Sequence, residues 1–228
     1  MALISEDDAI KLLEEMVNTH KDNFGTSPEK IMQHFSGTKR IAREIAKKLG
    51  LSPDELAIAG LYHDTGRCFS KDKKSHTFHE IIGARYIEEH GVELEITDSQ
   101  EQCDRLAQAL RSHAFVSEQF VMDEYNQWLP GLRDTNPNLL LPSSWNELIV
   151  TYADLTNANG QVLDFKERLA DVKNRDRENN SPRLKAVEEA ESRLLTPRKR
   201  FKLCIRKRER GSNKMFYFMN FKEIKVTK

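Results

Sequence analysis

The sequence predicts a mainly α-helical protein, in which a helical bundle carries a small C-terminal β-hairpin. Apolar residues recur at spacings of three and four along most of the chain, which is the period of an amphipathic helix. After Pro197, two apolar stretches flank Gly211-Ser-Asn, a pattern that favours a β-hairpin. We therefore expect a helical domain over residues 1–196 and a basic hairpin extension over residues 197–228.

The composition indicates a folded protein with one main domain. A chain of 228 residues is long enough for one sizeable core, and its helical spacing of apolar residues argues against disorder. The net charge is zero, which argues against a protein built wholly to bind nucleic acid. From Pro182 onward, however, 15 Lys or Arg residues accompany only five Asp or Glu residues. This basic end leaves nucleic acid open as a weaker partner, although such a run is more often a solvated face.

Nothing in the sequence indicates export or membrane insertion. The first eight residues are acidic and lack the apolar run of a signal peptide, and no later stretch has the length of a membrane span. Cys68, Cys103 and Cys204 are far apart and form no C-x-x-C pair, which predicts neither disulfides nor a thiolate zinc site. We expect a cytoplasmic protein with reduced cysteines and no membrane partner.

The second expected helix places a histidine on its buried face. Ser5 fits the N-cap of the first helix, and Ser27-Pro28 fits the N-cap and first turn of the second. The inward stripe of apolar side chains in this second helix includes His34, and Gly50 fits the left-handed residue that ends a helix. His34 is therefore expected among core-facing side chains.

The third expected helix ends in a histidine and an aspartate. Ser52 to Glu55 form a capping box with proline at the first helical position. The residues that follow are apolar on every side, so the helix is buried, and several are small enough to let neighbouring helices approach closely. His63 and Asp64 lie at the C-terminal end of this helix, and Gly66 is expected to end it.

Three later helices carry further polar side chains into the expected core. They are His79 near the first turn of a helix that begins around Phe78 and is ended by His90-Gly91, His113 at the end of the apolar stripe of a helix that begins near Thr97, and Asp154 in the middle of a buried helix over residues 145–160. Between the helices of His113 and Asp154, residues 115–144 show no helical spacing of apolar residues. A substrate lid and a surface insertion are equal interpretations of this segment.

Buried histidines and aspartates need polar partners, because burial without them is costly. A metal ion satisfies both residue types. His34, His63, Asp64 and Asp154 form a mixed nitrogen and oxygen set suited to divalent Fe, Mn, Mg, Co or Zn, with positions left for water. A single buried histidine is more often a hydrogen-bonded core residue, but four such residues in buried helices favour a metal site.

The order of these residues is similar to the H…HD…D signature of the HD superfamily. Leu61-Tyr-His-Asp-Thr-Gly-Arg67 matches the HD segment, and Ala153-Asp-Leu matches the distal aspartate. The resemblance extends roughly from His34 to the helix ending near Leu195. It implies an HD-type helical bundle and a metal-dependent phosphohydrolase, which acts on a nucleotide or a related small phosphoester through a metal-activated water.

Two more histidines resemble the extra ligands of the H…HD…H…H…D branch, which holds two metals. They are His79 in His-Glu-Ile-Ile-Gly-Ala and His113 in Leu-Arg-Ser-His. The resemblance implies that Asp64 bridges the two ions. His76 is a rival of His79, but the Gly-Ala pair after His79 fits the family pattern better. A hydrogen-bonded core histidine is an equal alternative for His113 alone.

Basic residues near these segments are candidates for binding phosphate. Arg67 resembles the basic residue that often follows HD-x-G in the superfamily, and with Asp64 it is our candidate catalytic residue. A helix C-terminal cation is an equal interpretation of Arg67. Lys71, Lys74 and Arg111 are weaker candidates for substrate binding and are more often solvated.

Three functions from different classes remain after these observations. Phosphoester hydrolysis is the first, with a nucleotide favoured by the resemblance. The second is an HD-type mixed-valence di-iron oxygenase, since some members of the superfamily use a similar ligand set in that way. The third is a binding module whose basic tail contacts nucleic acid, but that tail lacks any named nucleic-acid motif.

Overall fold

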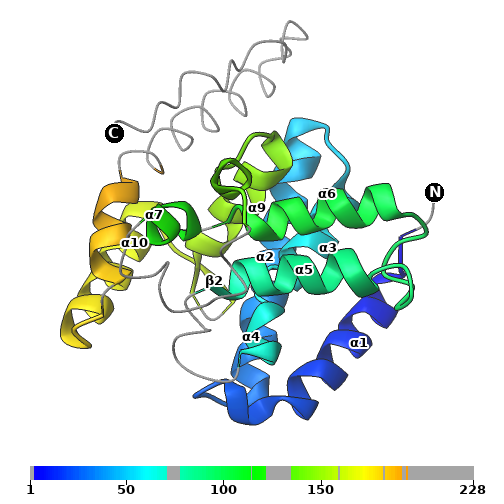
Figure 1. The fold of residues 1–228 in the computed structure, drawn as a ribbon, viewed down its shortest axis with the longest axis horizontal. Helices are drawn as coiled ribbons and strands as arrows, with labels where there is room; N and C mark the ends of the chain where they lie inside the picture. The colour runs from blue at the N-terminus through cyan, green and yellow to red at the C-terminus, as the bar shows by residue number, and fades with distance from the viewer. Residues whose placement is uncertain are drawn as a thin grey trace, which may run out of the picture.

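Helices dominate the structure, as predicted (Figure 1). The computed structural model describes residues 3–70, 78–113, 115–121, 135–158, 160–181, 183–191 and 194. Its elements are α1 (Glu6–Thr19), η1 (Lys21–Asn23), α2 (Pro28–Leu49), α3 (Pro53–Tyr62), α4 (Gly66–Phe69), α5 (His79–His90), α6 (Gln100–Arg111), α7 (Val116–Val121), η4 (Pro137–Leu140), α9 (Trp145–Leu155), β1 (Asn157–Ala158), β2 (Gln161–Val162) and α10 (Phe165–Glu178). Residues 183–191 are also helical. None of the helices within these ranges is both long and apolar enough to span a membrane.

The described residues hold one small sheet, and it is not the predicted hairpin. Strands β1 and β2 pair antiparallel, with Asn157 opposite Val162 and Ala158 opposite Gln161. The predicted C-terminal hairpin belongs to residues 197–228, which lie outside the described residues. The mainly α-helical fold is thus confirmed, while the hairpin stays a prediction.

Most predicted helix boundaries follow from local capping. The Ser5 hydroxyl accepts a hydrogen bond from the Asp8 amide at 3.2 Å. The Ser52 hydroxyl likewise accepts from the Glu55 amide at 3.4 Å. Gly50 ends α2 with φ of 68°, a left-handed conformation that glycine adopts without strain. The starts of α1 and α3 and the end of α2 are therefore set largely within their own segments.

One predicted helix ends earlier than expected. The periodicity predicts a helix over residues 145–160, but α9 ends at Leu155. The chain then turns, because the side-chain oxygen of Asn157 accepts a hydrogen bond from the Gly160 amide at 2.9 Å and Gly160 has φ of 84°. Strand β1 occupies the end of the predicted helix, and β2 follows directly after it.

Gly66 has a different role from the one that its position predicts. Helix α3 ends at Tyr62, and Gly66 begins α4 rather than stopping α3. A Cβ atom at Gly66 would lie 1.8 Å from the backbone oxygen of His79 and 2.6 Å from the amide nitrogen of Gly83. Glycine is required here because the backbones of α4 and α5 approach too closely for any side chain.

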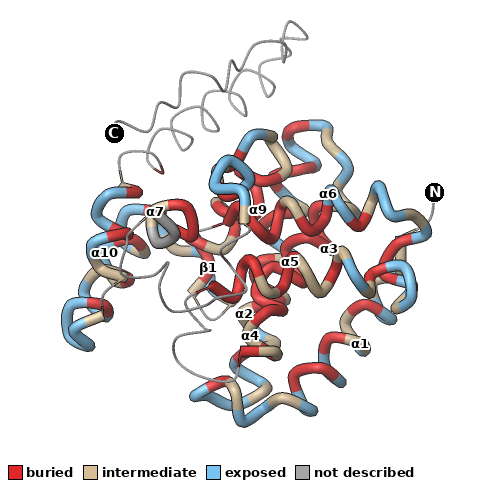
Figure 2. Tube along the Cα trace, viewed as in Figure 1, coloured by how far each residue is buried: buried red, intermediate tan, exposed pale blue. Residues whose placement is uncertain are grey.

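The main hydrophobic core joins α1, α2, α3, α5, α6 and α9, and their buried faces meet in its interior (Figure 2). Helix α3 is buried on every side, as predicted. Helices α2 and α3 come very close where a Cβ atom on Gly60 would lie 3.0 Å from the backbone oxygen of Thr38. This close approach places the end of α3 beside the middle of α2.

A second, smaller core fixes the C-terminal helices. Its members come from the segment before α7, the end of α9, α10 and residues 183–194, and they are Phe115, Leu155, Phe165, Leu169, Val172, Val187, Ala190 and Leu194. Tyr152 of α9 packs against both cores and stacks on Phe165 with ring centroids 5.6 Å apart. Helix α10 is therefore attached directly to α9.

The contact at Gly66 predicts a graded loss of stability. We expect Gly66→Ala to lower the free energy of unfolding by roughly 3 kcal/mol, at the top of the usual range for overpacking, because backbone atoms cannot yield as a flexible side chain does. Gly60→Ala, whose nearest contact would be 3.0 Å, should cost less. Urea unfolding measures both. Equal costs for the two variants would contradict the proposed α4 and α5 contact.

Candidate metal centre

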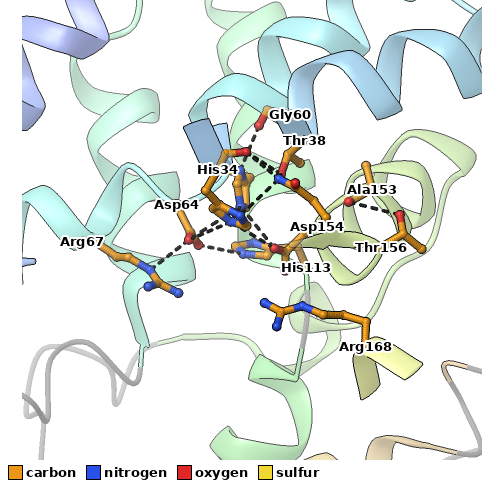
Figure 3. A network of polar contacts seen from close by, with 12 residues as sticks. His34, Thr38, Gly60, Asp64, Arg67, His113, Ala153, Asp154, Thr156 and Arg168 are labelled. Carbon is orange, nitrogen blue, oxygen red and sulfur yellow. Dashed lines mark hydrogen bonds and ion pairs between the residues drawn. The ribbon is translucent and has the colours of Figure 1, made fainter. Parts of the chain in front are cut away.

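Six side chains singled out by the sequence converge in one place. Figure 3 labels four of them, His34, Asp64, His113 and Asp154. They come from α2, the turn after α3, the first residue of α5, the segment after α6, and α9, and they are His34, His63, Asp64, His79, His113 and Asp154. Four of these residues are buried, whereas the side chains of His34 and Asp154 keep exposures of 19% and 16%. The cluster therefore opens to solvent on the side of His34 and Asp154.

The first group within this cluster has the spacing of ligands around one cation. His34 Nε2 lies 3.1 Å from His63 Nε2, 3.2 Å from Asp154 Oδ1 and 3.6 Å from Asp64 Oδ2. His63 Nε2 lies 3.5 Å from Asp154 Oδ1 and 3.6 Å from Asp64 Oδ2. Two donors that bind one metal at about 2.1 Å are separated by roughly 3.0 Å at a right angle and 3.4 Å at a tetrahedral angle.

The second group shares Asp64 with the first. The other carboxylate oxygen of Asp64, Oδ1, lies 2.7 Å from His79 Nε2 and 3.4 Å from His113 Nε2. Each oxygen of Asp64 thus faces a different pair of imidazoles. This is the arrangement expected of a carboxylate that bridges two cations.

Backbone carbonyls orient two of the imidazoles. His63 Nδ1 lies 2.9 Å from the Gly60 oxygen, and His113 Nδ1 lies 2.5 Å from the Leu110 oxygen. Because a carbonyl oxygen only accepts, each Nδ1 carries the proton and each Nε2 presents its lone pair to the cluster when the ring is neutral. A ligating histidine in a metalloprotein is typically held in this way.

Asn157 holds His34, and the sequence analysis missed it. Its side-chain nitrogen lies 3.1 Å from His34 Nδ1, and the same nitrogen donates to the His34 backbone oxygen at 2.6 Å and to the Thr38 hydroxyl at 2.9 Å. Gly37 leaves the room for it, since a Cβ there would lie 2.5 Å from Asn157 Oδ1. The only signal in the sequence was a polar residue three positions after Asp154.

The carboxylates stay ionised despite their burial. Burial raises the pKa of Asp64, but Arg67 and the nearby imidazoles, His63 first among them, outweigh burial and hold that pKa well below its usual value. Burial also raises the pKa of Asp154, but hydrogen bonds from His34 and His63 outweigh burial and hold that pKa well below its usual value. Two negative charges therefore remain at the centre of the cluster.

The imidazoles respond to those charges. Burial lowers the pKa of His34, but hydrogen bonds and charge from Asp154 and Asp64 raise it to about 9. The pKa of His113 is likewise lowered by burial but raised to about 9, chiefly by Asp64. Burial prevails at His63, whose pKa is lowered. Without a cation, protons on two histidines thus offset the two carboxylates.

The donor set fits divalent cations. Four imidazoles and two carboxylates provide the nitrogen and oxygen donors that Mn²⁺, Fe²⁺, Co²⁺ and Zn²⁺ accept. His113 Nε2 is buried and has no hydrogen-bond partner among the described residues, as expected of an atom reserved for a metal. Cys68 and Cys103 are buried and free but do not belong to the cluster. The described residues thus support a site for divalent metal.

A pocket of about 320 Å³ opens over the cluster. Its lining includes five of the six predicted ligands together with five cationic side chains, Lys30, Arg67, Arg168, Arg175 and Arg183. Arg67 Nε lies 2.9 Å from Asp64 Oδ2, so this predicted catalytic residue reaches the centre. The three arginines of the C-terminal helices were not singled out from the sequence.

Of the other predicted substrate-binding residues, the structure describes only Arg111, and it lies away from the pocket. Arg111 is buried and pairs with Glu88 at 2.5 Å and with Gln108 at 3.2 Å, and it does not line the pocket. Its charge therefore stabilises the contact between α5 and α6. Lys71 and Lys74 lie outside the described residues, as does His76, the rival of His79.

The divided donor set predicts an asymmetric loss of metal. We expect the wild-type chain to bind about two equivalents of Mn²⁺, and His79→Ala and His113→Ala each to lose about one of them, because each removes a ligand of the second group only. His34→Ala should disrupt the other ion. Mass spectrometry of metal content in purified protein measures this. His90→Ala, which changes a half-exposed imidazole away from the cluster, is the matched control. One equivalent in wild type, unaffected by loss of His79 and His113, would remove both from the ligand set.

The contacts of Asn157 predict that it supports the site without touching a metal. We expect Asn157→Ala to weaken metal binding by roughly 10- to 100-fold, the usual effect of removing a residue that orients a ligand. Titration calorimetry with Mn²⁺ measures the change, and Asn138→Ala, at an exposed position, is the control. If Asn157→Ala lowered only the melting temperature and left the affinity unchanged, its role would be purely structural.

Comparison with known proteins agrees with this geometry. The profile of the HD domain family matches residues 31–159, which is more than half of the chain and includes all six clustered residues. Searches of curated proteins and of solved structures gave no match. The chain belongs to the HD domain family, a superfamily of metal-dependent hydrolases.

Proposed function

We propose that the protein is a metal-dependent phosphohydrolase that acts on a nucleotide or a related small phosphoester. The observation that carries this proposal is the divided carboxylate of Asp64, whose two oxygens face different imidazole pairs in a cluster that adjoins a cationic pocket. A bridged pair of cations with open positions suits attack of water on a phosphorus atom. The cationic lining suits a substrate that carries negative charge.

Each clustered residue has a distinct part in this proposal. His34, His63 and Asp154 would hold one cation and His79 and His113 the other, with Asp64 between them. When bound, the cations supply a Lewis acid that lowers the pKa of a water molecule and offsets phosphate charge. No serine or cysteine nucleophile is then required.

In this proposal Arg67 binds the reacting phosphate. Its Nε approaches Asp64, and its side chain is 37% exposed at the pocket. An arginine has further N–H donors in the same plane, which match phosphate oxygens. Arg67 therefore both orients Asp64 and offers charge to the phosphate as negative charge develops there.

The alternative, a mixed-valence di-iron oxygenase, uses a similar ligand set. Cationic side chains suit a phosphonate as well as a phosphate, so the pocket does not separate the two classes. The metal requirement does separate them. Oxygen activation needs a metal that changes its oxidation state, whereas hydrolysis needs only a Lewis acid and an open coordination position.

The hydrolytic proposal predicts a redox-neutral reaction. With Mn²⁺, Mg²⁺ or Zn²⁺ supplied to metal-depleted protein, we expect phosphate release from at least one member of a nucleotide panel, and the rate should persist without oxygen. Colorimetric phosphate assays under nitrogen measure this, and Asp64→Ala is the inactive control. Strict dependence on both iron and oxygen, with no phosphate from any nucleotide, would favour the oxygenase instead.

A further inference from the structure

The wall of the pocket formed by the C-terminal helices is rich in arginine. Arg168 and Arg175 lie two turns apart on α10, and Arg183 lies at the start of the helical stretch that follows. All three line the pocket that contains the metal cluster. Figure 3 shows Arg168 reaching from α10 toward the cluster, from the side opposite Arg67. Two separate segments therefore present guanidinium groups to one space.

The positive charge on this wall exceeds its local negative charge. Arg168 pairs with Oδ2 of Asp171, and Arg175 Nε contacts the same oxygen at 3.3 Å. Arg183 takes both oxygens of Asp176 in a bidentate pair at 2.9 Å. Three guanidinium groups thus share two carboxylates, which leaves one positive charge without a counterpart in this group.

Two further observations show that the burial and charge of these arginines are not fully compensated by their neighbours. Arg168 Nε is buried and has no hydrogen-bond partner among the described residues. Burial, with repulsion from Arg168 and Arg183, lowers the pKa of Arg175. A buried donor without a partner and like charges side by side are both relieved by an anion that binds between them.

The second core keeps this wall in place relative to the cluster. Val172, which also lines the pocket, packs in that core with Leu155, the residue directly after Asp154. Tyr152 stacks on Phe165 at the start of α10. The arginines are therefore held by α9, which also carries the metal ligand Asp154, rather than by a separate domain.

We propose that Arg168, Arg175 and Arg183 form an anion subsite for the distal phosphates of a substrate with two or more consecutive phosphate groups, such as a nucleoside diphosphate or triphosphate. This proposal rests on the proposed function, in which the reacting phosphate lies at the metal cluster beside Arg67. In that function the cluster and Arg67 bind the single phosphate of a monophosphate. A second cationic wall is needed only when further phosphate groups follow the reacting one. A base or a sugar needs aromatic or neutral polar partners instead.

The pocket size favours a small polyphosphate over a nucleic-acid strand. Its volume of about 320 Å³ is at the lower end for small-molecule sites. A strand that passes through it would need an open groove that continues past the site on both sides. Nucleic acid is therefore the less favoured ligand for this wall.

Arg177 provides a matched control within the same helix. It lies two residues beyond Arg175, its side chain is 59% exposed, and it does not line the pocket. It contacts Asn174 at 3.0 Å and Glu188 at 3.9 Å. A change from Arg to Gln at 177 removes the same charge from α10 without altering the pocket wall.

The first experiment measures binding of inorganic tripolyphosphate and orthophosphate to the full chain by calorimetry, with EDTA present so that the anion does not chelate metal. We expect Arg168→Gln/Arg175→Gln to weaken tripolyphosphate binding by roughly 10- to 100-fold, since charge-assisted hydrogen bonds are lost. Arg177→Gln should leave it unchanged. If the double variant fails to fold, Arg175→Gln alone changes a half-exposed side chain and gives the same test.

The second experiment compares kcat/KM for a nucleoside monophosphate and the matching triphosphate in Mn²⁺-loaded protein. The double variant should lose at least about tenfold on the triphosphate while the monophosphate rate stays within about twofold. Equal losses on both substrates, or equal binding of tripolyphosphate by all variants, would overturn the subsite. A third result would assign the arginine wall to nucleic acid. In that case a single-stranded oligonucleotide would bind in a way that depends on the arginines, while tripolyphosphate would not bind.

The two experiments separate this subsite from the proposed function. If no nucleotide is hydrolysed but tripolyphosphate binding still depends on the arginines, the subsite stands and the hydrolase proposal fails. If monophosphates are hydrolysed and the arginine variants change nothing, the hydrolase proposal stands and the subsite fails.

Discussion

The buried carboxylate of Asp64 is the constraint around which the rest of the structure is arranged. A negative charge taken out of water is stable only if positive or polar groups surround it. Asp64 is only 2% exposed, and its partners come from four parts of the fold, namely α2, α4, α5 and the segment after α6. The close backbone contacts at Gly60 and Gly66 are what allow these segments to meet at one side chain.

Much of the fold and of the metal cluster could be predicted because the signals are local. Helix periodicity placed His34 on the buried face of α2, and capping residues placed the start of α3, so that His63 and Asp64 fall at its end. The family resemblance then selected His79 and His113 from the remaining histidines. The structure brings all six predicted residues together.

The residues that the sequence did not reveal act through long-range contacts. Asn157 touches His34 across 123 positions, and no local pattern marks such a contact. Arg168 and Arg175 belong to a charged amphipathic helix, in which most cations face solvent, so their pocket position depends on how α10 packs on α9. Arg111 is the opposite case. Its position two residues before His113 suggested a part in substrate binding, but its side chain pairs with Glu88 on α5.

The attachment of α10 to α9 through Tyr152 has a consequence for cooperativity. Because this ring packs against both hydrophobic cores, the C-terminal helices cannot detach without exposing part of α9 to water. In the proposed complex, an anion between Arg67 and Arg168 would join the same two parts of the molecule from the pocket side. An anion in the pocket would then slow local opening of α10. Amide hydrogen exchange in α10 would therefore report on anion binding at the metal cluster, although α10 contributes no ligand to that cluster.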